Sequence, residues 1–251
     1  MIDPRLTVIG RRLAPVRRIL AFASAKGGVG KSVCSALAAL ALADSGRRAG
    51  LLDLDFQGAS AHLLLGAQLG FPEEAAGIKP LRVRDKLDFM SFAAFSRERA
   101  VPLRGPEVTE ALVELLAITI WDPLDFLIVD MPPGIGDELL DVLRLLERPE
   151  FVVVATPSAL SLRVVERLLA LLVELRLPIR GLLENMARPG ISSDGGPVLE
   201  LAARFQLPVL GSIPWLPDVE ELLAGSDPLA GPLGPPIRGV LRRLTDGVGS
   251  L

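Results

Sequence analysis

Short apolar runs alternate along this chain with longer segments in which apolar and polar residues recur at helical spacing. Buried parallel strands that are covered by helices have this pattern. The runs predict strands at residues 19–23, 49–55, 87–92, 150–155, 179–183 and 208–214, and a further strand that ends at residue 130. The segments between them predict helices at residues 33–43, 107–120, 159–175 and 237–248.

This alternation predicts one doubly wound α/β domain over residues 1–251, with a mostly parallel sheet of about seven or eight strands flanked by helices. Residues 1–18 form an N-terminal lead-in, which is either an amphipathic segment packed beside the first strand or a basic patch for DNA or a membrane. Residues 237–251 form a C-terminal helix and tail. Its apolar face predicts either a closing helix on the sheet or a membrane anchor.

Composition narrows the class of protein. Apolar residues make up 50% of the chain, and the mean hydropathy is +0.44. No uninterrupted apolar run reaches the roughly 18 residues that a membrane-spanning helix needs. The single cysteine, Cys34, excludes an internal disulfide framework, so we expect a cytoplasmic protein. A net charge of −3 gives no general attraction to nucleic acid or anionic lipid.

The first strand and the first helix are joined by a glycine-rich loop, Ser24-Ala25-Lys26-Gly27-Gly28-Val29-Gly30-Lys31-Ser32. Strand, glycine loop and helix form the setting of a phosphate-binding loop, in which backbone N–H groups surround a polyphosphate. Lys31 is placed to reach the β- and γ-phosphates, and the Ser32 hydroxyl to ligate Mg²⁺. The usual template has glycine where this chain has Ala25, and Lys26 is an additional lysine.

The segment Ala-Lys-Gly-Gly-Val-Gly-Lys-Ser resembles the deviant Walker A motif of the MinD/ParA/Mrp group of P-loop ATPases. The resemblance implies that Lys26 reaches across the interface of a homodimer to the partner's nucleotide, with ATP sandwiched between the subunits. It assigns nucleotide contacts to Lys26, Gly27, Gly28, Val29, Gly30, Lys31, Ser32, Val33, Asn185 and Pro214. Among these, Asn185 contacts the adenine ring and Pro214 lies near it in the family.

Two further strands end in carboxylate side chains. Ligand sites of open parallel sheets lie at these carboxyl ends of the strands. The second strand ends at Asp53 and Asp55, and a later strand ends at Asp130. By resemblance, Asp53 and Asp130 hold the Mg²⁺ shell through water, and Asp55 positions the attacking water. The expected catalytic residues are therefore Lys26, Lys31 and Asp55.

The segment that begins with Asp130, Asp-Met-Pro-Pro-Gly-x-Gly-Asp, resembles the Mrp/ApbC type more than MinD or ParA. Its prolines and glycines suit a loop that changes with the state of the nucleotide. The similarity spans roughly residues 19–245. One family element is missing, because no Cys-x-x-Cys follows Glu184-Asn185-Met186, where Mrp-type carriers share a cluster across their dimer. Cys34 lies at an apolar position of the first helix, so we expect no iron–sulfur cluster.

These residues predict slow, Mg²⁺-dependent ATP hydrolysis used as a conformational switch. Three uses of the switch stay open: an Mrp-like accessory ATPase in iron–sulfur or metalloprotein maturation without a Cys-x-x-Cys site, a MinD/ParA-like positioning ATPase on membrane or DNA, and a non-hydrolysing scaffold stabilised by nucleotide. The sequence contains no strong indication of nucleic-acid or membrane binding, and it does not identify the client protein.

Overall fold

The computed structural model describes residues 3–56, 58–68, 77–96, 105–192, 196–224 and 227–245. Within them, eight strands form one sheet in the order β3-β4-β2-β5-β1-β6-β7-β8. The strands are β1 (Val16–Ala23), β2 (Ala49–Asp53), β3 (Leu81–Arg84), β4 (Leu87–Ser91), β5 (Leu124–Asp130), β6 (Pro149–Ala155), β7 (Ile179–Ala187) and β8 (Val209–Pro214). All neighbours pair in parallel except β3 and β4. The predicted doubly wound, mostly parallel fold is confirmed.

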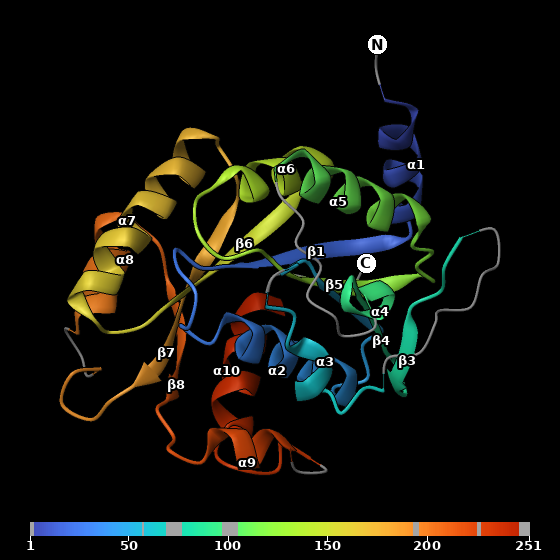
Figure 1. Ribbon diagram of the computed structural model, residues 1–251. Coiled ribbons are helices and arrows are strands. Elements are labelled where there is room, and N and C mark those ends of the chain that lie inside the picture. Colours follow the sequence, from blue (N-terminus) through green and yellow to red (C-terminus); the bar gives the residue numbers. More distant parts are fainter. Residues whose placement is uncertain are drawn as a thin grey trace.

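Helices cover both faces of the sheet (Figure 1). They are α1 (Pro4–Leu13), α2 (Lys31–Asp44), α3 (Ala61–Leu64), α4 (Ala93–Ser96), α5 (Pro106–Ile118), α6 (Asp137–Leu145), α7 (Ala159–Glu174), α8 (Pro197–Arg204), α9 (Val219–Ala224) and α10 (Gly234–Thr245). α2 and α10 share a core with one face, and α5, α6, α7 and α8 share a core with the other. None of the described helices is long and apolar enough to cross a membrane.

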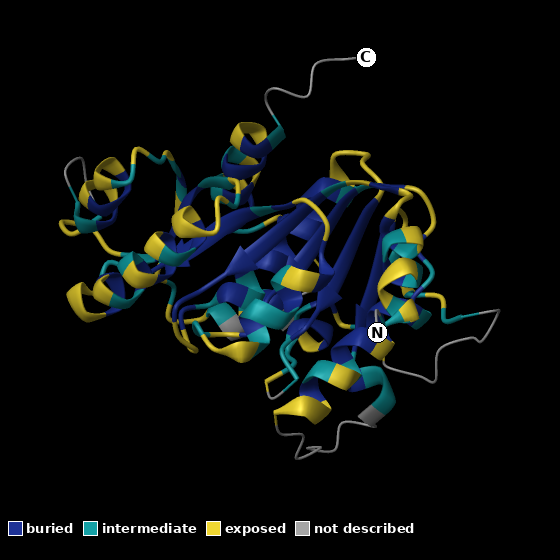
Figure 2. Ribbon diagram, turned by 90° about the horizontal axis from the view of Figure 1, so that it is seen from above, coloured by how far each residue is buried: buried dark blue, intermediate teal, exposed yellow. Residues whose placement is uncertain are grey.

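The inner strands are apolar on both sides because each face meets a helical layer (Figure 2). In β1, Leu20 and Phe22 pack toward α2 and α10, while Ala21 and Ala23 pack toward the opposite layer. All four are buried, and full burial of a side chain such as Phe22 is worth about 1.5–3 kcal/mol. The carboxyl end of β1 is thereby held rigidly where the glycine loop begins.

The lead-in forms helix α1, which packs against α5. Asp3 caps the helix by accepting a hydrogen bond from the backbone N–H of Arg5 at 2.9 Å, and Ile9 and Leu13 are buried. The Arg12 Nε donates to the Ala117 carbonyl at 3.2 Å. These contacts favour the packed amphipathic segment over a free basic patch.

Several predicted boundaries differ from the structure. β1 begins at Val16, before the predicted start of the strand, so the lead-in ends earlier than residue 18. β7 continues to Ala187, beyond the predicted end of its strand. Strand β3 was not predicted, because its half-exposed sequence at the sheet edge lacks an apolar run. α10 ends at Thr245, and residues 246–251 of the predicted tail lie outside the described part of the chain.

Gly50 of β2 has no side chain, and the space beside it is filled by side chains from β5 and the segment just before it. A Cβ atom there would lie 2.7 Å from Trp121 Cζ3 and 2.8 Å from Leu124 Cδ1. We expect Gly50→Ala to lower the free energy of unfolding by about 1–3 kcal/mol, measured by urea denaturation, because the core is overpacked.

The control is Gly239→Ala in α10, where the nearest atom to an added Cβ is 4.0 Å away. This variant should gain about 0.5–1 kcal/mol, because alanine favours a helix interior. Equal stability of Gly50→Ala and the parent would show that β2 shifts freely to make room.

Candidate functional site

The glycine loop lies between the end of β1 and the first turn of α2. Gly28 and Gly30 have φ angles of 78° and 79°, a left-handed conformation that favours glycine. α2 begins at Lys31 without a side-chain cap at Gly30, so the first N–H groups of the helix face the loop. These groups and the helix dipole make the loop suited to an anion.

Asn185 of β7 holds the loop from the neighbouring side of the sheet. Its Nδ2 donates to the Val29 carbonyl at 2.8 Å, and the asparagine is only 6% exposed. A Cβ atom on Gly30 would lie 2.2 Å from the same Nδ2, so the two segments touch directly. The sequence predicted an adenine contact for Asn185, and it gave no sign of this loop contact.

Lys31 and Asp130 form a buried ion pair at the centre of the site. Lys31 Nζ lies 2.5 Å from Asp130 Oδ1, and the two residues are 5% and 0% exposed. The second carboxylate oxygen, Asp130 Oδ2, is buried without a hydrogen-bond partner in the described part of the chain. Burial raises the pKa of Asp130, while the Lys31 ammonium and the Ser32 hydroxyl act in the opposite direction.

Asp53 lies beside Asp130, because the two residues are in register at the ends of β2 and β5. Its Oδ1 accepts from the Asp55 backbone N–H at 3.0 Å, and its Oδ2 from that of Ala61 at 3.4 Å. Burial, and next the charge of Asp130, raise the pKa of Asp53 to about 7. Asp53 therefore organises its own loop as well as adding negative charge.

The residues present fit a magnesium–nucleotide complex. Ser32, Asp53 and Asp130 offer the oxygen ligands that Mg²⁺ prefers, and Asp130 Oδ2 is a buried acceptor without a donor. The described residues contain no group of three or more His, Cys, Asp or Glu side chains that could enclose a metal alone. Mg²⁺ usually keeps waters and binds substrate phosphates besides one or two carboxylates.

Lys26 lies on the exposed side of the same loop. The Ser24 hydroxyl donates to the Lys26 carbonyl at 3.1 Å and fixes the turn. Lys26 borders a cavity of about 360 Å³ together with Gly27, Gly28, Val29, Thr156, Pro157, Ser158, Met186, Arg188 and Ile191. The two lysines of the loop are therefore separated, with Lys31 in the interior and Lys26 at the surface.

Asp55 lies on a loop beyond β2, half-buried, and its Oδ1 accepts from the Gly58 backbone N–H at 2.8 Å. It borders a hollow of about 760 Å³ at the start of α5 and α6, where other acidic side chains gather. Burial, and next Asp55 and Asp141, raise the pKa of Glu138 in this hollow. The loop after β5 contacts the glycine loop, because the Gly134 N–H donates to the Ser24 carbonyl at 3.0 Å.

The remaining predicted residues lie around this centre. Val33 follows Ser32 in the first turn of α2, and Pro214 ends β8. The Trp215 N–H donates to the Ala187 carbonyl at 2.9 Å, which joins the ends of β8 and β7. The Arg188 guanidinium lies over the Trp215 ring at 5.4 Å. The sequence did not indicate this stacked pair, which joins two loops far apart in the chain.

A glycine loop between a strand and a helix, with a buried lysine–aspartate pair beneath it, defines the class of P-loop NTPases. A family model described as "ParA: NUBPL iron-transfer P-loop NTPase" matches residues 15–231. The chain belongs to this family, which confirms the predicted membership of the MinD/ParA/Mrp group.

Curated relatives are named iron-sulfur cluster carrier proteins. That of Rickettsia felis is 35% identical over 224 residues, covering 89% of this chain and 69% of the relative. That of Aquifex aeolicus is 35% identical over 237 residues, covering 87% and 63%. The chain thus spans about two thirds of the length of these relatives.

Solved structures agree with the fold. A nucleotide-binding protein of Archaeoglobus fulgidus in complex with ADP has a TM-score of 0.73 and 30% identity, covering 87% of this chain and 90% of its own. The septum site-determining protein MinD of Pyrococcus horikoshii, complexed with Mg-ADP, has a TM-score of 0.65 and 21% identity, covering 92% and 97%. The second likeness concerns the fold alone.

Replacing Lys31 by methionine removes the partner of a buried carboxylate. We expect Lys31→Met to lower the free energy of unfolding by about 3–5 kcal/mol near neutral pH, measured by urea denaturation. Burial places the pKa of the unpaired Asp130 above its unfolded value of about 3.9. The loss should therefore be small below that pH, where both states are protonated, and should grow as the pH rises.

The matched control is Lys31→Met/Asp130→Asn, which removes both charges at similar volume. It should recover most of the lost stability and lose the added pH dependence. A double variant that is no more stable than Lys31→Met would show that the cost arises from packing rather than from the unpaired charge.

Proposed function

We propose that this chain binds Mg²⁺–ATP, hydrolyses it slowly and uses the bound nucleotide as a conformational switch. The observation that carries the proposal is the buried Lys31–Asp130 pair under the glycine loop, with one carboxylate oxygen lacking a donor. Membership of the P-loop family and the likeness to an ADP-bound protein support it.

The loop would hold the phosphates through its backbone N–H groups and those of Lys31, Ser32 and Val33 at the start of α2. When nucleotide binds, the Lys31 ammonium group would leave the Asp130 carboxylate and contact phosphate oxygens instead. Both partners are anions within reach of the same ammonium group. Mg²⁺, when bound by Ser32 and through water by Asp53 and Asp130, supplies charge neutralisation on the phosphates. Asn185 and Pro214 would contact the adenine from the ends of β7 and β8.

Asp55 would orient the attacking water. Its loop begins at Asp53, whose carboxylate accepts from the Asp55 N–H. The segment after β5 would be the second moving part, because Gly134 is hydrogen-bonded to the phosphate loop. A change at the γ-phosphate position would therefore act on both borders of the hollow at α5 and α6.

The use of this switch would be iron–sulfur or metalloprotein maturation in the cytoplasm. The relatives named as iron-sulfur cluster carriers support this process. We propose that the chain acts without a cluster of its own, as an accessory ATPase on a client still to be identified. Cys34 is buried, and burial raises the pKa of its thiol, which disfavours the thiolate that a cluster needs.

We propose that residues 1–251 form a single ATPase domain and that two copies form a homodimer with ATP between them. The supporting observation is the separation of the two loop lysines, which leaves Lys26 exposed at the nucleotide side. There it would be free to reach a partner's phosphates.

A positioning ATPase on a membrane is less well supported. The apolar residues of α10 that would anchor it are buried against the sheet, namely Ile237, Val240, Leu241 and Leu244.

A non-hydrolysing scaffold is the other alternative. A phosphate-release assay distinguishes it from the ATPase, because a scaffold would release no phosphate from ATP.

Asp55→Ala tests hydrolysis. The variant should bind Mg²⁺–ATP like the parent in isothermal titration, because the proposed phosphate contacts come from the glycine loop and the first turn of α2. Its turnover in the phosphate-release assay should fall roughly 100-fold, because a residue that positions or deprotonates the attacking water is lost. Glu110→Ala is the control, since Glu110 is an exposed acid on the same hollow. If Asp55→Ala turns over like the parent, the role belongs to another acid.

Lys26→Ala tests the dimer. We expect the variant to bind ATP, to stay monomeric by light scattering with ATP and Mg²⁺, and to hydrolyse ATP poorly. The reason is that two facing nucleotides would bring together negative charge that Lys26 neutralises. Lys79→Ala, an exposed lysine just before β3, serves as the matched control. Dimer formation by Lys26→Ala at the parent's level would leave Lys26 a surface lysine without a role.

A further inference from the structure

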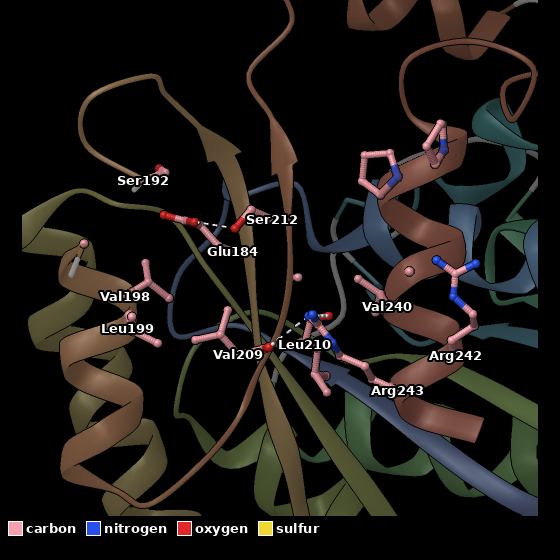
Figure 3. A pocket seen from close by; sticks show the side chains of 15 residues that line it. Glu184, Ser192, Val198, Leu199, Val209, Leu210, Ser212, Val240, Arg242 and Arg243 are labelled. Atoms are coloured by element: carbon pink, nitrogen blue, oxygen red, sulfur yellow. Dashed lines mark hydrogen bonds between the residues drawn. The ribbon is translucent and has the colours of Figure 1, made fainter. Parts of the chain in front are cut away.

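β8 is the last strand of the sheet, and within the described residues no strand pairs with its outer edge. A groove of about 950 Å³ follows this edge between α8 and α10 (Figure 3). Val198 and Leu199 of α8 form one wall, and Val240 of α10 lies in the other. Leu199 is 45% exposed, which is unusual for a large apolar side chain beside a sheet.

Glu184 of β7 lies at one end of this groove and is only 4% exposed. Its Oε2 accepts a hydrogen bond from the Ser212 hydroxyl at 2.6 Å, whereas its Oε1 is buried without a partner in the described structure. Glu184 shares the α8 side of β7 with Leu182, while Leu183 and Asn185 lie on the side of α2 and α10. The unpartnered oxygen therefore lies on the other face of β7 from the contact between Asn185 and the glycine loop.

The opposite end of the groove is positive. Arg242 and Arg243 of α10 border it, and Arg243 Nη1 donates to the carbonyls of Leu210 at 2.7 Å and Val209 at 3.3 Å. These carbonyls lie at the start of β8, and Ser212, which contacts Glu184, lies three residues after Val209. The carbonyls that Arg243 contacts lie two and three residues before Ser212, which is roughly 7–10 Å of strand, so Arg243 and Glu184 border different parts of the groove.

We propose that this groove binds an extended peptide segment of a partner protein, which adds a strand to the outer edge of β8. The bound strand would place a lysine or arginine on Glu184 Oε1 and, three residues away on its other face, a carboxylate near Arg243, whose side chain reaches the β8 edge. Strand addition uses the backbone groups of an exposed edge for affinity and side-chain pockets for specificity.

Three observations favour a strand over a small ligand. The groove follows the edge of β8, its walls on both faces are apolar, and its charges alternate between faces as side chains of a strand do. Arg243 now covers two edge carbonyls, and backbone N–H groups of the added strand would replace it. The added strand would be covered by α8 and α10, as the inner strands are by their helices.

The test uses synthetic peptides of about ten residues, the usual upper length of a strand, that alternate valine and threonine. One peptide carries lysine and glutamate three residues apart, and its companion has the two exchanged. Affinity is measured by fluorescence anisotropy, and amide protection of residues 209–214 by hydrogen exchange. One of the two peptides has lysine and glutamate in the order that matches the charges of the groove. With the parent protein, this peptide should bind at least about ten-fold more tightly than the other and protect the β8 amides.

Glu184→Gln keeps the shape and the Ser212 contact but removes the charge. It should reduce the preference between the two peptides to about two-fold or less, while Glu200→Gln on the exposed side of α8 keeps it. Arg243→Glu, at an exposed position, should weaken the preferred peptide and serves if Glu184→Gln does not fold. ATP binding by Glu184→Gln should equal that of the parent, so this test is independent of the proposed ATPase.

Three results would overturn the proposal. Neither peptide binds the parent, or the preference survives in both Glu184→Gln and Arg243→Glu, or lysine amide alone displaces the peptide completely. The last result would indicate a site for small amines rather than for an added strand.

Discussion

The buried Lys31–Asp130 ion pair is the interaction on which the rest of the site depends. It joins the first residue of α2 to the last residue of β5, and so fixes the glycine loop over the central strands. Two opposite charges in the interior are stable only while they are paired. In the proposed function, a phosphate in the loop would compete for the same ammonium group, so the ligand would act on the carboxyl ends of the central strands without any change in the core.

Most of the fold could be predicted, because the inner strands are buried on both faces. Each of them therefore appears in the sequence as a short, continuous apolar run between helical segments. β3 escaped prediction because a half-exposed edge strand such as Leu81–Arg84 has no continuous apolar signal. The glycine loop could be located from its spacing between a strand and a helix, whereas the roles expected for Asp53 and Asp130 came from the family resemblance. The contact of Asn185 with Val29 and the stacking of Arg188 on Trp215 could not, because each joins loops that only the sheet order brings together.

β7 illustrates how one strand serves two surfaces. Consecutive side chains point to opposite faces, so Asn185 reaches the phosphate loop while Glu184 reaches the groove beside α8. The two residues are neighbours in the sequence motif Glu-Asn-Met. Their different contacts become visible only once β7 is paired with its neighbouring strands. Adjacent residues in the chain can therefore belong to unrelated sites.

The contact between Gly30 and Asn185 also restricts how this protein can diverge. A side chain at position 30 would need a left-handed backbone and would collide with the amide at 2.2 Å. The loop cannot retreat, because α2 is buried along most of its length between the sheet and other helices. A smaller residue at position 185 would relieve the collision but not the left-handed strain, so position 30 should stay glycine whatever residue position 185 takes.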